Sequence, residues 1–325
     1  MQLGVATLEA SLDEALDLGG RATALAESSG RAVLISVSLQ AEAIVLGALQ
    51  REASVRELSS ARFDGARVVR RRTTGTEAEL RGPTLYHALA LPKVSSLYAD
   101  ASSRTLLNRN LRAFLRGYAA AGVPFRYFGT EVLSLLGQPV ALVGYDKLAS
   151  GAVCIELLIG LEHPCVVRPA LQREPPASLF AALRNQSRPI DFLQRAVLGV
   201  AERLGAAAVD VGAELMGVIA PAPLVAPPAL AAPPALVAPE FARVSVPIGV
   251  VEATVRSGVH VTGDLLTSLS ALRCVEALAD ASLASGASPG AEILVPLDGE
   301  PLDGARAVDL LGVIVNAVSL ARGAG

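Results

Sequence analysis

The sequence contains no tryptophan, and aromatic residues make up only 4% of its 325 residues. Alanine, leucine, valine and glycine supply the apolar bulk, so we expect a core built from many small aliphatic contacts. Basic residues are not in excess either, because 28 Lys and Arg stand against 31 Asp and Glu and the formal net charge is -3. A chain without a basic surplus lacks the electrostatic footprint of a general nucleic-acid binder, so we expect no nucleic-acid partner.

Cysteine is scarce as well. Cys154, Cys165 and Cys274 are odd in number, far apart and without CxxC spacing, which favours reduced thiols in a core over disulfides or a zinc site.

The mean hydropathy is +0.47, yet Arg, Glu, Asp or proline interrupts every apolar run before it reaches the length of a membrane span. Residues 1–20 carry acidic side chains where a signal peptide carries Lys or Arg. We therefore expect a cytoplasmic protein without a membrane partner.

The length and the proline distribution indicate two domains. A chain of 325 residues with 52% hydrophobic residues can bury one large and one small core. Between Pro221 and Pro239 there are seven prolines and no charged residue, which is typical of an extended spacer or of a strap along a domain surface. We predict a domain over 1–218, a Pro/Ala-rich linker over 219–240 and a smaller domain over 241–325.

Hydrophobic periodicity predicts alternating helices and strands. Apolar residues recur at helical spacing in 8–29, 100–121, 177–184, 190–204 and the segments that follow Gly263 and Ala307. Alternating or continuous apolar runs predict strands at 31–38, 42–47, 66–72, 84–92, 151–160 and 244–255, and a further short strand that ends near Val261. This mixture indicates an α+β protein.

The most informative stretch is 70–91, where three arginines open onto a glycine and then an apolar run. Guanidinium groups, hydroxyl groups and glycine backbone N–H groups together can surround a phosphate or a carboxylate. The residues with these groups are Arg70, Arg71, Arg72, Thr73, Thr74, Gly75 and Thr76. The simpler alternative is a solvated basic strand end that leads into a turn.

Taken whole, this stretch resembles the lipoate-binding motif of the lipoate-protein ligases. In the motif an arginine pair is followed by two hydroxyl residues, three glycines and a small apolar residue, and then by a strand with Thr-Leu. The matching residues here are Arg71, Arg72, Thr73, Thr74, Gly75, Ala78, Thr84 and Leu85. Two of the three glycines are missing, and Thr76 and Glu77 stand in their places.

The C-terminal portion is similar to the small accessory domain of the same family. The shared features are Ile-Gly, Glu-Ala, a glycine turn and Gly-Asp before a helix, found here at Ile248, Gly249, Glu252, Ala253, Gly258, Gly263 and Asp264. The resemblance implies a central mixed sheet with flanking helices as in biotin/lipoate protein ligases, together with a small α+β accessory domain.

One departure from the family concerns catalysis. The family carries a lysine on a Gly-x-Lys-hydrophobic turn, whereas this sequence has Pro139 after Gly137 and Gln138. Losing one preorganised donor of that kind costs on the order of 10²- to 10³-fold in rate. Lys147 is a possible substitute that reaches back from the next turn, although its Gly, Asp and Ser neighbours favour a solvated loop lysine.

Other candidate catalytic groups are weaker. Cys154 could act as the nucleophile, as in octanoyl transferases of this fold, but a structural buried thiol is the better interpretation. His87 in the strand at 84–92 is better explained as a core residue than as a base. His163 and Cys165 flank Pro164 and supply only two potential ligands, so we expect no metal site.

The resemblance therefore leads to two functional hypotheses. We expect a non-catalytic relative that binds a lipoyl or octanoyl ligand, a lipoyl-carrier protein or another protein partner. The alternative is an active ATP-dependent lipoate-protein ligase or an octanoyl/lipoyl transferase that modifies a carrier-domain lysine, and this enzyme would need lipoate and ATP with Mg²⁺. In both cases the expected ligand-binding residues are Arg71, Arg72, Thr73, Thr74 and Gly75.

Overall fold

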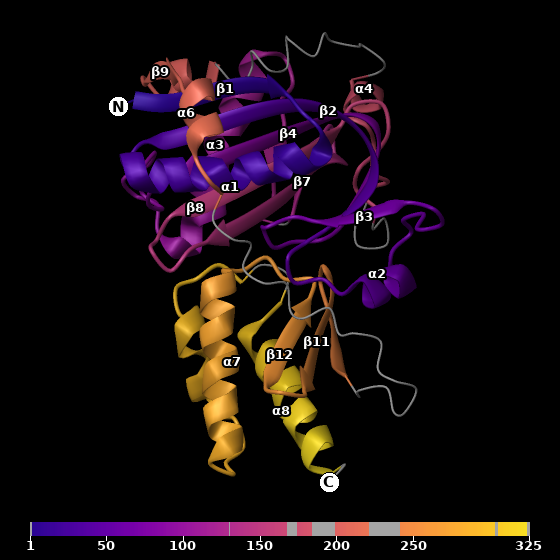
Figure 1. The fold of residues 1–325 in the computed structure, drawn as a ribbon. Helices are drawn as coiled ribbons and strands as arrows, with labels where there is room; N and C mark the ends of the chain where they lie inside the picture. The colour runs from indigo at the N-terminus through magenta and orange to yellow at the C-terminus, as the bar shows by residue number, and fades with distance from the viewer. Residues whose placement is uncertain are drawn as a thin grey trace.

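A computed structural model of the chain describes residues 2–129, 131–167, 174–183, 199–220, 241–302 and 305–323. These residues form a large sheet of nine strands and a separate sheet of three strands. Figure 1 shows the large sheet above the small sheet, with the C-terminal helices packed beside the latter. The arrangement is mixed α+β, as the sequence predicted.

The large sheet combines parallel and antiparallel pairs. Its strand order is β5-β6-β7-β8-β4-β2-β1-β9, and β3 pairs with β2 beyond the end of β1. The pairs β1–β2, β1–β9 and β2–β3 are parallel and the others are antiparallel. The strands are β1 Gln2–Glu9, β2 Ala32–Leu46, β3 Arg67–Arg70, β4 Ala78–Leu91, β5 Arg126–Tyr127, β6 Val132–Leu135, β7 Gln138–Lys147, β8 Val153–Gly160 and β9 Ala207–Asp210.

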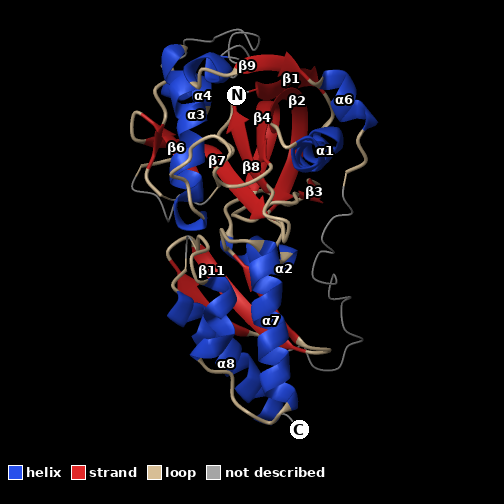
Figure 2. Ribbon diagram, turned by 90° about the vertical axis from the view of Figure 1, so that its left-hand side faces the viewer, coloured by secondary structure: helices blue, strands red, loops and turns tan. Residues whose placement is uncertain are grey.

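Two long helices cover opposite faces of the large sheet (Figure 2). Helix α1 (Leu12–Ser29) begins with a capping box between Ser11 and Glu14, and it ends at Gly30 in a left-handed conformation. Helix α3 (Leu106–Ala120) buries an apolar stripe that includes Phe114 against the other face. The sheet is therefore a central layer with an apolar core on each side.

The C-terminal region has a core of its own. Strands β10 (Ala242–Val246), β11 (Gly249–Val255) and β12 (Val259–Gly263) form an antiparallel sheet. Helices α7 (Leu269–Ala284) and α8 (Ala307–Gly323) pack beside it. Leu49, which follows β2 in the chain, is buried in this second core, and its carbonyl accepts a hydrogen bond from the backbone N–H of Gly263. The segment after β2 thus joins the two sheets.

Shorter elements complete the described structure. They are the helices α2 (Glu52–Leu58), α4 (Leu179–Ala182) and α6 (Gly212–Gly217), and the 3-10 segments Ser103–Thr105 and Ala291–Leu297. The predicted helix at 177–184 is confirmed as α4, with the Ser178 side chain as its cap. Among the residues that the structure places, no helix combines the length and the apolar character needed to cross a membrane.

Several predicted boundaries were wrong. The helix predicted at 8–29 starts only at Leu12, because 2–9 form β1, which the polar ends of this segment concealed. The strands predicted at 31–38 and 42–47 are one continuous strand, and the strand predicted at 244–255 is a hairpin. Residues 199–203 of the helix predicted at 190–204 are helical, whereas 190–198 and linker residues 221–240 lie outside the described ranges.

Candidate functional site

The arginine loop, defined as residues 70–77, connects β3 to β4 where the large sheet meets the C-terminal region. The backbone N–H of Arg71 donates to the carbonyl of Leu46, and the carbonyl of Thr73 accepts from the backbone N–H of Ala48 at 2.9 Å. Thr74 forms a backbone bridge to Tyr145 in β7. These contacts hold the loop across the ends of β2 and β7.

Arg71 lies inside the protein with only 2% of its surface exposed. Its guanidinium is enclosed between two glycines, because a Cβ atom would lie 2.6 Å from Nη2 if built on Gly75 and 2.7 Å from Nη1 if built on Gly144. Gly75 also has φ = 113°, a conformation that L side chains rarely adopt. Nη2 donates to the Thr76 carbonyl at 2.9 Å, whereas Nε and Nη1 have no hydrogen-bond partner among the residues that the structure describes.

The carboxylate of Glu156 in β8 lies beside this guanidinium. Thr73 Oγ1 donates a short hydrogen bond to Glu156 Oε2, and Tyr86 Oη donates to Oε1 at 2.6 Å. Burial lowers the pKa of Arg71, an effect that the charge of Glu156 opposes. Burial, and then the charge of Glu156, raise the pKa of Tyr86 well above its ordinary value, so Tyr86 remains a phenol that donates.

The sequence predicted Arg71 and Thr73 at this site but missed Glu156 and Tyr86. Both lie in other strands and join the loop only through the pairing of β4 with β8. One signal was available, because Glu156 is the only charged residue within the apolar strand 153–160. A carboxylate in a strand buried on both faces calls for a partner.

Helix α1 approaches this cluster with two glycines, Gly19 and Gly20. A Cβ on Gly19 would lie 2.2 Å from Tyr86 Oη, and a Cβ on Gly20 would lie 2.9 Å from Arg72 Nε. Arg72, the second predicted arginine, is 26% exposed and pairs with Asp17 of α1 at 3.3 Å. It therefore lies next to the Arg71 cluster and closer to the surface.

The closing segment, defined as residues 263–268, covers the arginine loop from the C-terminal region. The backbone N–H of Gly75 donates to the Leu265 carbonyl at 2.8 Å, and the backbone N–H of Thr74 donates to the Tyr145 carbonyl at 3.0 Å. Thr74 Oγ1 lies 2.8 Å from the Tyr145 carbonyl oxygen and 2.9 Å from that of Thr267, so its one proton is directed at these acceptors. In this structure the Thr74 and Gly75 donors that were predicted to bind an anion are bonded to the chain itself.

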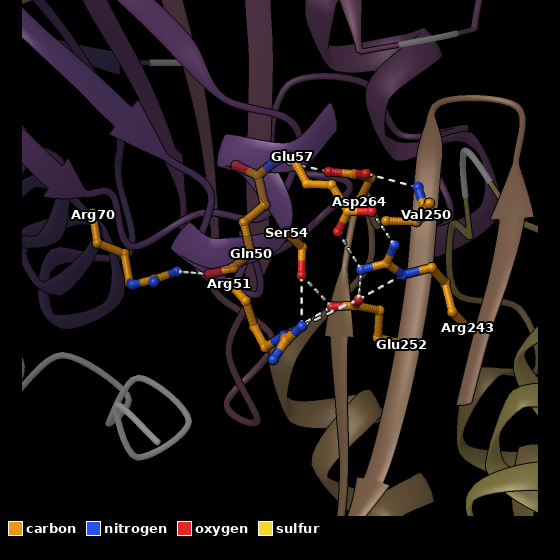
Figure 3. Close-up of polar contacts among 9 residues, drawn as sticks. All are labelled: Gln50, Arg51, Ser54, Glu57, Arg70, Arg243, Val250, Glu252 and Asp264. Atoms are coloured by element: carbon orange, nitrogen blue, oxygen red, sulfur yellow. Dashed lines mark hydrogen bonds and ion pairs between the residues drawn. The ribbon is translucent and has the colours of Figure 1, made fainter. Parts of the chain in front are cut away.

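A glutamine joins the arginine loop to the closing segment (Figure 3). Gln50 Nε2 donates to Glu77 Oε2 and to Asp264 Oδ1, each at 2.7 Å. Arg70 Nη1 donates to the backbone carbonyl of Gln50, and Asp264 Oδ2 accepts from the backbone N–H of Val250 at 2.7 Å. Glu77, which replaces a motif glycine, is thus part of the contact between the two regions.

A second group of charges beside it fixes α2 to the small sheet (Figure 3). The side chain of Glu252 is fully buried and accepts from Arg51 Nε at 2.8 Å, Ser54 Oγ at 2.6 Å and Arg243 Nε at 2.9 Å. Arg243 also forms a two-point contact with Glu57 at 3.0 Å. Burial raises the pKa of Glu252, but the hydrogen bonds from Arg51 and Ser54 outweigh it and the pKa is lowered on balance.

Pro139 and Lys147, the two positions considered for the family lysine in the sequence, lie at opposite ends of β7. Pro139 is near the start of β7, paired with Ser134 of β6, and not in a turn as predicted. It is five positions from Gly144, which is about 16 Å along an extended strand. Lys147 ends β7 and is not the solvated lysine that its neighbours suggested, because its Nζ donates to Ser103 Oγ at 3.0 Å and pairs with Glu300.

The remaining candidates for a catalytic role, Cys154 and His87, are buried and neutral. Cys154 is 8% exposed, and burial followed by the charge of Glu156 raises its pKa well above the ordinary value. Burial lowers the pKa of His87 to about 3, and its Nε2 is hydrogen bonded to Tyr118. Cys165 is buried, but Cys274 is exposed, contrary to the prediction of a core thiol. Within the described ranges no group of three or more His, Cys, Asp or Glu side chains could hold a metal ion.

Comparison with known proteins shows the fold. No protein-family model matches the sequence, and no curated protein matches it. The structure of lipoate-protein ligase A bound with ATP is 14% identical, with a TM-score of 0.50 over 65% of this chain and 88% of that chain. P. falciparum LipL1 in complex with lipoate is 10% identical, with a TM-score of 0.56 over 96% of this chain and 100% of that chain. The chain has the fold of these ligases.

Proposed function

We propose that this chain, which has the fold of lipoate-protein ligases, is a divergent relative that binds a lipoyl or octanoyl group on a carrier protein without catalysing its attachment. The observation that carries the proposal is the state of the arginine loop. The backbone donors of Thr74 and Gly75, which would have to face an acyl-phosphate, are bonded to Tyr145 and Leu265. A nucleotide would have to break these bonds before it could bind there.

The charges around the loop support the same proposal. Arg71 is buried beside Glu156, and Glu77 lies within the loop. Two carboxylates near one buried guanidinium oppose the approach of a triphosphate or an acyl-adenylate. In addition, Pro139 brings neither charge nor donor, and Lys147 is engaged by Glu300. The chain therefore lacks an available cation in the part of β7 where the family lysine is expected.

The test is calorimetry with ATP and lipoate, singly and together, followed by a search for acyl-adenylate and for transfer to a lipoyl-acceptor domain. We expect no adenylate and no transfer, and tighter binding of a lipoylated acceptor domain than of the same domain without the modification. Equal affinity for the two forms of the domain, with no binding of any ligand, would refute the proposal and leave only the fold.

The alternative is an active ligase, and the partial exposure of Arg72 next to the cluster favours it. An active enzyme would form adenylate in the same assay and would lose that activity in Arg72→Ala. Arg67→Ala is the matched control, because Arg67 is exposed and pairs with Asp13 at the surface. Equal adenylate formation by the two variants would show that Arg72 has no role in catalysis, and the arginine loop would then support neither the non-catalytic relative nor the active ligase.

A further inference from the structure

Glu156 and Arg71 place a hydrogen-bond acceptor beside unused donors in one buried cluster. Glu156 already accepts from Thr73 and Tyr86, and a carboxylate has about four lone-pair positions, so it can accept further bonds. Arg71 is 2% exposed, and no acceptor for its Nε and Nη1 is found within the described part of the chain. A buried donor without a partner is costly, so a ligand oxygen that reached these atoms would be favoured.

We infer that Glu156 determines the ligand class of this site, which takes the acyl group as a neutral amide and excludes the free carboxylic acid and the acyl-phosphate. An amide has a carbonyl oxygen that can accept from Arg71 and an N–H that can donate to Glu156. The inference rests on the proposed function and names its ligand, which is the acyl amide formed with a carrier lysine. Lipoamide is the small-molecule probe with the same chemistry.

The charge of Glu156 explains the exclusion. A ligand carboxylate bonded to Arg71 would meet the charge of the Glu156 carboxylate, which already acts on this guanidinium, in a buried region with little water to screen the repulsion. The two hydroxyl donors that could bind its oxygens are already bonded to Glu156. Glu156 is therefore already the anion of this site. A second anion would be repelled by its charge, and the hydroxyl groups of Thr73 and Tyr86 would not be available to bind it.

The cluster is enclosed by the chain. Gly75 and Gly144 flank the guanidinium, and Gly19 of α1 lies against Tyr86 and Glu156. Ligand entry therefore requires a shift of α1 or of the closing segment, and we expect slow association. Access limits the rate for all ligands alike, so it does not affect the comparison between an acid and an amide with the same acyl chain.

The experiment compares lipoate, lipoamide and lipoic acid methyl ester by calorimetry at pH 7.5. For the wild type we expect lipoamide to bind about tenfold or more tightly than lipoate, because the acid meets Glu156. The ester is neutral but has no N–H, so it should bind about tenfold more weakly than the amide. This ligand series needs no variant and remains informative if a substitution in the cluster prevents folding.

Glu156→Gln is the matched substitution, since it removes the charge while keeping the size and an acceptor. We expect it to raise the affinity for lipoate about tenfold or more, so that the preference for the amide disappears. Tyr86→Phe is the control, because it removes one bond to Glu156 and leaves the carboxylate, so the preference for the amide should remain.

Three results would overturn the inference: wild-type protein that binds lipoate as tightly as lipoamide, a preference that Glu156→Gln leaves unchanged, or binding of none of the three compounds. Equal binding of acid and amide without turnover would end this inference and leave the proposed function intact. Adenylate formation by the wild type would instead end the proposed function.

Discussion

Gln50 and Asp264 lie 214 positions apart in the sequence and are joined by a buried hydrogen bond of 2.7 Å. The same amide group donates to Glu77 in the arginine loop, so one side chain connects the loop, the segment after β2 and the C-terminal region. Two backbone hydrogen bonds, from Gly75 to Leu265 and from Gly263 to Leu49, join the same three segments. The contact between the two sheets is therefore organised around polar groups whose partners come from both regions.

Asp264→Ala should destabilise this contact strongly. The substitution leaves the Val250 N–H and the Gln50 amide without the carboxylate that accepts from them. Unsatisfied buried donors of this kind cost about 2–5 kcal/mol in total. We expect a lower midpoint in thermal unfolding, whereas Asp298→Ala at an exposed position should change it little. An equal effect of the two substitutions would show that the Gln50 contact adds no stability.

Gly19→Ala tests how closely α1 must approach the polar cluster. Alanine favours a helix by about 1 kcal/mol over glycine, so the substitution would stabilise an unobstructed helix. At Gly19 the new Cβ meets Tyr86 Oη at 2.2 Å and Glu156 Oε1 at 2.9 Å, so the helix or the cluster must shift. We expect a net loss of about 1–3 kcal/mol in the free energy of unfolding.

Gly20→Ala is the matched control for this substitution. The three atoms nearest to its Cβ would all belong to the side chain of Arg72, which is partly exposed and can move. This variant should be neutral or slightly more stable than the wild type in denaturant unfolding. The reverse order of the two variants would mean that α1 does not rest on Tyr86 and Glu156.

Local signals in the sequence predicted the elements well where periodicity and caps agreed. The stripe of α3 and the short helix α4 are examples, because the apolar spacing that predicts each lies within a few positions of the sequence. The candidate site was predicted only as far as the arginine loop, which is a local motif. Glu156 and Leu265 reach that loop through strand pairing and inter-region packing, and no residue near the motif encodes their positions.

Asp146→Asn should alter the dependence of stability on pH. Asp146 Oδ1 accepts from the backbone N–H groups of Lys147 at 2.8 Å and Leu269 at 3.0 Å, and an asparagine oxygen can accept both. Burial raises the pKa of Asp146 from 3.8 to about 6. The folded state thus holds this proton more tightly than the unfolded state, and the resulting stability is lost as the pH rises from about 4 to about 6.

The variant cannot titrate at this position, so it should gain stability relative to the wild type as the pH rises. A shift of about two pKa units corresponds to about 3 kcal/mol between pH 4 and pH 7.5. The measurement is the difference in unfolding midpoint between variant and wild type at several pH values, with Asp64→Asn at an exposed position as control. A constant difference over this range would contradict the raised pKa of Asp146.

The three cysteines should differ sharply in reactivity, which tests the hypothesis of a cysteine nucleophile. A thiol reacts as its thiolate, and burial raises the pKa of Cys154 well above its ordinary value and that of Cys165 to about 11. Cys274 is exposed on α7. Iodoacetamide at pH 8 should therefore modify Cys274 alone in the native protein and all three after unfolding, as read by mass spectrometry. Cys274→Ser is the control and should leave the native protein unmodified, whereas rapid native modification of Cys154 would restore it as a candidate nucleophile.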